Sequence, residues 1–175
     1  MFQLSLFFKS DQRSLKHQFQ YQLPDQDYYG DPIIFGEPAE VQAKFFKVQE
    51  KIFLDLEVNF SFEMKCARCL ELIRQEKSVN KSFQLIAENQ QQDLTEQDHE
   101  EDVIHYEKDQ IDLEGIVHEQ VLLEIPIKVV CDENCNGICS QCGNLRDDGN
   151  CNCDEAATEE ETDPRLAKLK DWYQE

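Results

Sequence analysis

The sequence predicts an α+β fold: a mainly antiparallel sheet with one or two helices and a cysteine-rich metal-binding segment towards the C-terminus. Three observations predict it. Residues 53–66, FLDLEVNFSFEMKC, alternate apolar and polar side chains, as a long strand with one buried face does. Residues 111–126, IDLEGIVHEQVLLEIP, carry an imperfect helical stripe that stops at Pro126. Six of the eight cysteines lie between Cys131 and Cys153.

Three shorter strands accompany the long one in a strand-rich core that covers residues 1–87. They are expected at residues 17–23, 41–49 and 77–87, the last returning after Cys69. Most of the eleven phenylalanines alternate as inward-facing positions do. They are therefore expected to fill the core, and an aromatic platform for stacking nucleic-acid bases is the less favoured alternative.

The second half of the chain begins with a polar, acidic stretch at residues 88–110, which predicts a mobile loop. A helix capped by Asp112 follows, and residues 111–153 are expected to pack on the core within one single domain. Its apolar stripe comprises Leu113, Ile116, Val117, Gln120, Val121 and Leu123. Residues 154–175 form an acidic tail with a short terminal helix, for which Asp163 is the N-cap and Pro164 the first helical position.

The net charge of -20 is concentrated in residues 91–175, which hold 6 basic and 24 acidic side chains. A polyanion repels phosphate at long range, so this half favours a basic protein partner over nucleic acid. The alternative is that the acidity serves solubility alone.

The N-terminal residues MFQLSLFFKS show no basic leader, and no apolar run approaches the roughly 20 residues of a membrane span. We therefore expect a cytoplasmic protein without membrane contact. In a reducing compartment, clustered cysteines indicate metal ligands rather than disulfides. A chain of 175 residues can also bury a core without covalent staples.

The cysteine spacing indicates one or two zinc ions. Cys139-Ser-Gln-Cys142-Gly143 has the form of a zinc knuckle, and the turn dipeptide Asp148-Gly149 folds the chain back towards it. The favoured site combines Cys139, Cys142, Cys151 and Cys153. Candidates for a second site are Cys131, Cys135, Cys66 and Cys69. Which cysteines share a metal stays open, and an iron–sulfur cluster is the less favoured cofactor.

Residues 65–81 carry a local charge excess of +3 inside this acidic chain, and they are the candidates for RNA phosphate contact. The basic residues are Lys65, Arg68, Arg74, Lys77 and Lys81. A salt-bridged strand edge is the alternative explanation. No phosphate-binding loop, nucleophile elbow or zinc-protease motif occurs, so we expect no catalytic residues, no enzyme activity and no small-molecule substrate.

The order of motifs resembles the YceD family. Cys-Ala-Arg-Cys-Leu closes a strand, Leu-Glu-Ile-Pro-Ile follows the acidic spacer, and the distal cysteines precede Asp-Pro-Arg-Leu-Ala. The resemblance marks Cys66, Arg68, Cys69, Pro126, the six distal cysteines, Gly137, Gly143, Leu145 and Asp163 to Leu166.

This resemblance implies a non-enzymatic factor that supports 23S ribosomal RNA accumulation and large-subunit assembly, together with a ribosomal protein. We expect the acidic half to hold a basic ribosomal protein, while the basic strand end meets the large-subunit RNA or a pre-ribosomal particle. Two alternatives are a thiol oxidoreductase that uses Cys66 and Cys69, and a zinc-dependent protein-interaction module outside the ribosome.

Overall fold

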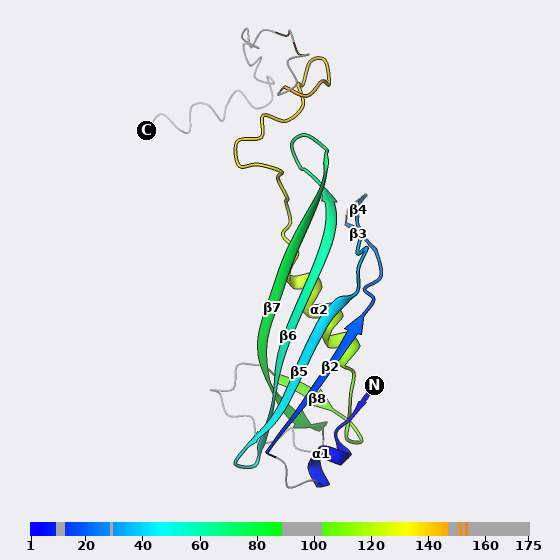
Figure 1. Cartoon of the computed structure of the whole chain (residues 1–175), viewed down its shortest axis with the longest axis vertical. Coiled ribbons are helices and arrows are strands. Elements are labelled where there is room, and N and C mark those ends of the chain that lie inside the picture. The colour runs from blue at the N-terminus through cyan, green and yellow to red at the C-terminus, as the bar shows by residue number, and fades with distance from the viewer. Residues whose placement is uncertain (10–12, 29, 89–102, 147–150, 152, 154–175) are drawn as a thin grey trace, which may run out of the picture.

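The computed structural model describes residues 1–9, 13–28, 30–88, 103–146, 151 and 153. Its main feature is a five-stranded sheet in the order β2-β5-β6-β7-β8 (Figure 1). The strands are β2 (Ser14–Tyr21), β5 (Ala39–Val48), β6 (Lys51–Lys65), β7 (Leu72–Ala87) and β8 (Val103–Tyr106). The first four pair antiparallel, and β8 is parallel to β7. The predicted antiparallel sheet is thus present, with one parallel pair at its edge.

Smaller elements flank this sheet among the described residues. Two short antiparallel pairs are β1 (Phe2–Gln3) with β9 (Gln110–Ile111), and β3 (Gln26–Tyr28) with β4 (Asp31–Ile33). The helices are α1 (Ser5–Lys9) and α2 (Leu113–Glu124). The described part therefore combines a sheet with the predicted helix, α2, and with α1, a short helix that the sequence pattern does not predict.

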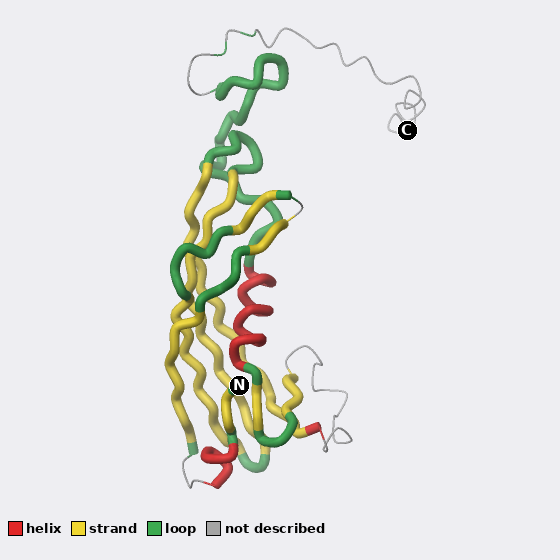
Figure 2. The backbone as a smooth tube through the Cα atoms, turned by 90° about the vertical axis from the view of Figure 1, so that its right-hand side faces the viewer, coloured by secondary structure: helices red, strands yellow, loops and turns green. Residues whose placement is uncertain are grey.

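The core lies on one face of the sheet, where α2 packs along the strands (Figure 2). Alternate side chains of β6 from Leu54 to Met64 are buried there, as period two requires. Asp112 caps α2, since its Oδ1 accepts a hydrogen bond from the Gly115 N–H at 3.3 Å. The predicted apolar stripe is wrong at Leu123, which is 73 % exposed. At about 100° per residue, this position points away from the buried row of Leu113, Val117 and Val121.

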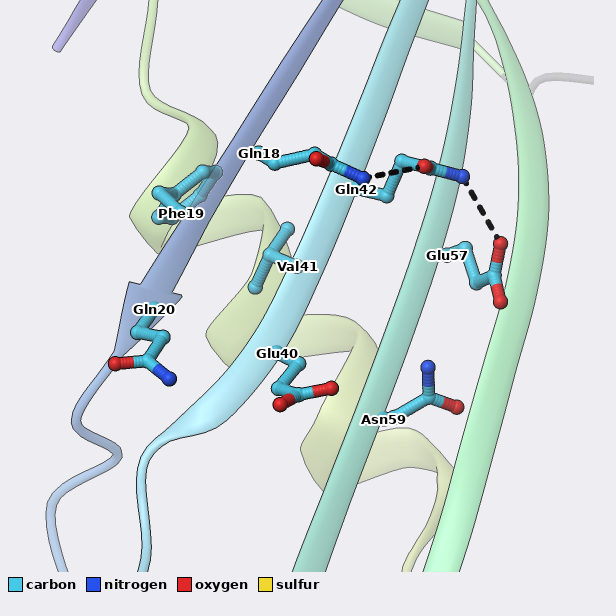
Figure 3. Close-up of a pocket in the computed structure, with 8 residues that line it drawn as sticks. All are labelled: Gln18, Phe19, Gln20, Glu40, Val41, Gln42, Glu57 and Asn59. Atoms are coloured by element: carbon cyan, nitrogen blue, oxygen red, sulfur yellow. Dashed lines mark hydrogen bonds between the residues drawn. The ribbon is translucent and has the colours of Figure 1, made fainter.

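The opposite face of the sheet, called the open face here, is polar over much of its length. Gln18 Nε2 donates to Gln42 Oε1 at 2.7 Å, and Gln42 Nε2 donates to Glu57 Oε2 at 3.2 Å. Figure 3 shows these side chains on the side of the strands away from α2. The alternation along β5 and β6 therefore separates an apolar core face from a hydrophilic face.

Part of the loop predicted over residues 88–110 is strand in the structure, because β8 and Gln110 of β9 lie within that range. Ile104 and Tyr106 pack against the core, although the acidic residues around them hide this short alternation in the sequence. Residues 89–102 and the predicted terminal helix at Asp163 and Pro164 lie outside the described residues. Within the described chain, no helix has the length and apolarity needed to cross a membrane.

Candidate metal centres

The connection between β6 and β7 is a tight turn that carries the first two cysteines. The Leu70 N–H donates to the Cys66 carbonyl at 3.0 Å, and the Cys66 N–H donates to the Glu71 carbonyl at 2.7 Å. Leu70 closes the turn in the left-handed region, with φ +65°. Cys66 and Cys69 are both buried in this turn, in spite of its position at the end of the sheet.

The chain returns to this turn after α2 and brings two more cysteines with it (Figure 1). The Ala67 N–H donates to the Val129 carbonyl at 2.8 Å, which places Cys131 beside the turn. The Arg68 guanidinium Nη1 donates to the carbonyls of Glu133 at 2.9 Å and Cys135 at 3.0 Å. Arg68 therefore fastens residues 133–135 to the end of the sheet.

These contacts assemble the first cysteine group, which comprises Cys66, Cys69, Cys131 and Cys135. Its four sulfur atoms lie within 4.8 Å of one another. The Cys66 and Cys135 Sγ atoms are 3.9 Å apart, and those of Cys69 and Cys131 are 3.6 Å apart. Four thiolates bound tetrahedrally at about 2.3 Å from one zinc ion would be about 3.8 Å apart. A disulfide needs about 2.05 Å, so the spacing fits a metal better than a cross-link.

The second cysteine group comprises Cys139, Cys142, Cys151 and Cys153, whose sulfur atoms also lie within 4.8 Å of one another. The Cys142 Sγ lies 3.8 Å from the Cys151 Sγ. Its knuckle closes locally: the Gly143 N–H donates to the Cys139 carbonyl at 2.9 Å. Gly143 adopts φ +75°, as the zinc-knuckle pattern predicts. The turn predicted at Asp148-Gly149 lies outside the described residues.

Gly137 joins the two groups by a close backbone contact. It is buried with φ +70°, and a Cβ at this position would lie 2.8 Å from the Arg68 carbonyl oxygen. That same oxygen accepts a hydrogen bond from the Ile138 N–H at 3.1 Å. The second group therefore begins directly after a segment that is fixed to the turn of the first group.

In each group, backbone hydrogen bonds lower the pKa of one thiol. Burial opposes ionisation of Cys66, but N–H donors from Cys69, Arg68 and Cys131 outweigh it and lower its pKa to about 6. N–H donors from Cys142 and Gln141 likewise lower the pKa of Cys139 to about 6. Each group therefore has one sulfur ready to act as a thiolate ligand near neutral pH.

In each group, the pKa of a neighbouring thiol is raised instead of lowered. Contact with Cys135 and Cys69 raises the pKa of Cys131 to about 12. Contact with Cys142, followed by burial, raises the pKa of Cys153 to about 12. A first thiolate thus opposes a second one at such short range, and a bound cation would remove this opposition. In both groups, a bound divalent cation would therefore favour ionisation of the remaining thiols.

The predicted basic residues do not form one surface. Arg68 donates to the carbonyls described above, and the Arg74 guanidinium pairs with the Glu37 carboxylate at 2.6 Å. The register places Lys77 opposite Phe60 and Lys81 opposite Leu56, both core-side positions, whereas Arg74 faces the other way. Because successive side chains of a strand point to opposite faces, the sequence itself already places Arg74 and Lys77 on different faces. A count of charges along the sequence overlooks this difference.

Taken together, the fold and the site define a class of protein: an α+β protein whose sheet end and C-terminal segment hold two groups of four cysteines that could each bind a metal ion. A family model described as "Large ribosomal RNA subunit accumulation protein YceD" matches residues 54–172. The chain belongs to the YceD family, as its cysteine motifs indicate, and the family suggests a role in ribosomal RNA accumulation. No curated protein and no solved structure matches the chain.

Proposed function

We propose that this protein is a non-enzymatic factor that supports 23S ribosomal RNA accumulation and assembly of the large ribosomal subunit. The observation that carries the proposal is the family match over residues 54–172, which includes all eight cysteines. The family description refers to accumulation of RNA and names no reaction. In this proposal the protein acts by binding, and the cysteine groups keep its binding surfaces in place.

Zinc is the metal we propose for both groups. Four cysteine ligands without an open position are typical of a structural zinc site, and the sulfur spacing agrees with this geometry. Cys66, Cys69, Cys131 and Cys135 would hold one ion, and Cys139, Cys142, Cys151 and Cys153 the other. When bound, zinc would supply the cohesion that residues 131–146 lack, because few of their side chains are buried. An iron–sulfur cluster is the alternative for ligands that are all cysteine.

A basic ribosomal protein is the proposed partner of the acidic half. Residues 91–175 hold 24 acidic and 6 basic side chains, which favours fast association with a cationic surface. This contact would let the factor accompany a ribosomal protein to the large-subunit RNA or to a pre-ribosomal particle.

The thiol oxidoreductase alternative receives less support from the arrangement of the thiols. A reactive dithiol must be open to its substrate, yet Cys66 is 0 % exposed and Cys69 is 8 % exposed. Each also has a sulfur neighbour outside the pair, because Cys66 Sγ lies 3.9 Å from Cys135 Sγ and Cys69 Sγ lies 3.6 Å from Cys131 Sγ. The four thiols fit a closed ligand set better than an accessible redox pair.

Depletion of the protein in its native cell tests the ribosomal role. Large- and small-subunit RNA are quantified side by side, and the subunits are separated on a sucrose gradient. We expect a selective loss of the large-subunit RNA, restored by the wild-type chain and by the open-face control Gln42→Ala. Unchanged RNA and subunit ratios would refute the ribosomal role.

The same cells test the zinc proposal separately. Cys69→Ser and Cys142→Ser should each remove one of two zinc equivalents from the purified protein and restore the RNA only in part. Full restoration by both variants would reject the zinc requirement while leaving the ribosomal role in place.

A further inference from the structure

Two phenylalanines lie outside the hydrophobic core. Nine of the eleven phenylalanines belong to the hydrophobic core or pack against it, and Phe46 and Phe53 do not. They lie opposite each other on β5 and β6, on the open face of the sheet. Their rings stack with centroids 5.5 Å apart and an interplanar angle of 19°. Both side chains are half-buried, so part of each ring surface is open to solvent.

The register surrounds this pair with hydrogen-bonding groups and lysines. Ser14 and Gln84 flank the rings in the same row across β2, β5, β6 and β7. The next row contains Lys16 and Lys44, and the Lys44 Nζ lies 5.3 Å from the centre of the Phe46 ring. Lys51 lies at the hairpin end beyond the rings, where its Nζ donates to Gln84 Oε1 at 3.3 Å.

One carboxylate among these rows, that of Asp55, is already engaged in contacts. Asp55 lies in the Lys44 row, 3.9 Å from the Lys44 Nζ, and accepts a hydrogen bond from the Ser82 hydroxyl at 2.7 Å. Lys16, Lys44 and Lys51 therefore lie in or beside these rows, with Asp55 in the Lys44 row and Glu50 next to Lys51 in the hairpin. This surface, comprising Lys16, Lys44, Phe46, Lys51 and Phe53, is called the aromatic–lysine surface.

We propose that the aromatic–lysine surface binds single-stranded RNA, with bases stacked on the Phe46 and Phe53 rings and phosphates held by the lysines. Neighbouring aromatic rings on an open sheet face offer π surfaces to unpaired bases, and lysines beside them compensate the phosphate charge. The surface lies at the opposite end of β6 from Cys66 (Figure 1), so RNA and the metal centres occupy different ends of the sheet.

Stacking of the two rings could instead serve the sheet alone, because cross-strand aromatic pairs stabilise neighbouring strands. The two roles predict different results for conservative changes. Tyrosine keeps the aromatic face, whereas leucine keeps an apolar side chain and removes the π surface. A purely structural pair would tolerate leucine and tyrosine alike in any RNA measurement.

The test is fluorescence anisotropy of the full-length, metal-loaded protein with a labelled single-stranded RNA of about ten nucleotides. We expect Phe46→Leu and Phe53→Leu each to weaken binding roughly 5- to 150-fold, and Phe53→Tyr to retain it. Lys44→Gln and Lys51→Gln should each flatten the slope of log affinity against log salt by about 0.7. Gln42→Ala, farther along the open face, is the matched control and should bind as the wild type does.

Several outcomes would overturn the proposal: no single-strand binding by the wild type, unchanged binding by a Phe46→Leu and Phe53→Leu double variant, or equal affinity for a duplex of the same sequence. That the RNA is ribosomal rests on the proposed function, but single-strand binding does not. Unchanged ribosomal RNA after depletion, with intact binding in vitro, would reject the proposed function and keep this site. Selective loss of large-subunit RNA after depletion, without single-strand binding in vitro, would reject this site and keep the proposed function.

Discussion

Replacement of Gly137 by alanine should weaken metal binding at the first cysteine group. Gly137 has φ +70°, and an alanine Cβ would lie 2.8 Å from the Arg68 carbonyl oxygen. Real Cβ atoms do not approach this closely, so the segment must move away from the turn. Such a movement breaks the hydrogen bond between the Ile138 N–H and the Arg68 carbonyl.

Two contributions set the size of this effect. A left-handed backbone costs an L-residue roughly 1–2 kcal/mol. Loss of the Ile138 hydrogen bond adds about 0.5–1.5 kcal/mol. The total is roughly 1.5–3.5 kcal/mol, which corresponds to about 10- to 400-fold in affinity if the movement is transmitted fully to the thiols. Gly143→Ala is the matched control: it has φ +75° with no atom within 4 Å, so only the backbone cost of roughly 1–2 kcal/mol applies.

Chelator competition followed by alkylation and peptide mass spectrometry reports the release of each cysteine separately. Gly137→Ala should expose Cys66, Cys69, Cys131 and Cys135 at lower chelator concentration than in the wild type. Gly143→Ala should act on Cys139, Cys142, Cys151 and Cys153 instead. Release of the same cysteines in both variants, or wild-type behaviour of Gly137→Ala, would show that the contact with Arg68 does not hold the first group together.

Four further predictions concern the low-pKa thiols, Arg68 and the cap of α2. In the metal-free protein, the difference in thiolate absorbance at 240 nm between the wild type and Cys66→Ser or Cys139→Ser should show each of these thiols titrating near pH 6; titration of both near pH 9 would contradict this. Because these two pKa values are lowered from 9.0, their stabilisation is complete above about pH 9 and is lost as the pH falls through about 6, which urea unfolding at several pH values measures. Arg68→Lys keeps the charge but loses the paired contacts to Glu133 and Cys135, so it should promote metal release from the first group without changing RNA affinity; reduced RNA affinity alone would instead favour a phosphate contact. Asp112→Ala should lower the free energy of unfolding by about 0.5–2 kcal/mol in urea, and an unchanged value would show that the cap is dispensable.

Local patterns in the sequence account for much of the fold. The alternation of residues 53–66 predicts β6, and its fully buried side chains lie where period two places them. Asp112 and Pro126 bracket α2, because a cap and a helix-breaking ring act within a few residues of their own position. The left-handed backbone of Gly143 is also predictable from the sequence, because it is part of the local knuckle formed by residues 139–143.

The grouping of the cysteines follows partly from the sequence and partly from the tertiary structure. Spacing along the chain indicates the knuckle of Cys139 and Cys142, because two intervening residues bring the thiols together locally. Spacing alone left open which cysteines share a group with Cys66 and Cys69. The return of residues 129–135 to the β6–β7 turn brings Cys131 and Cys135 there, through contacts between residues that are more than sixty positions apart.

Other features also required the tertiary structure. The parallel pairing of β8 with β7 and the position of Phe46 opposite Phe53 both follow from strand pairing and register. Periodicity and turn chemistry act over a few residues and are therefore legible along the chain. Pairing partners are chosen by the burial and hydrogen bonding that remote segments gain together, so only the folded chain decides which faces and which thiols meet.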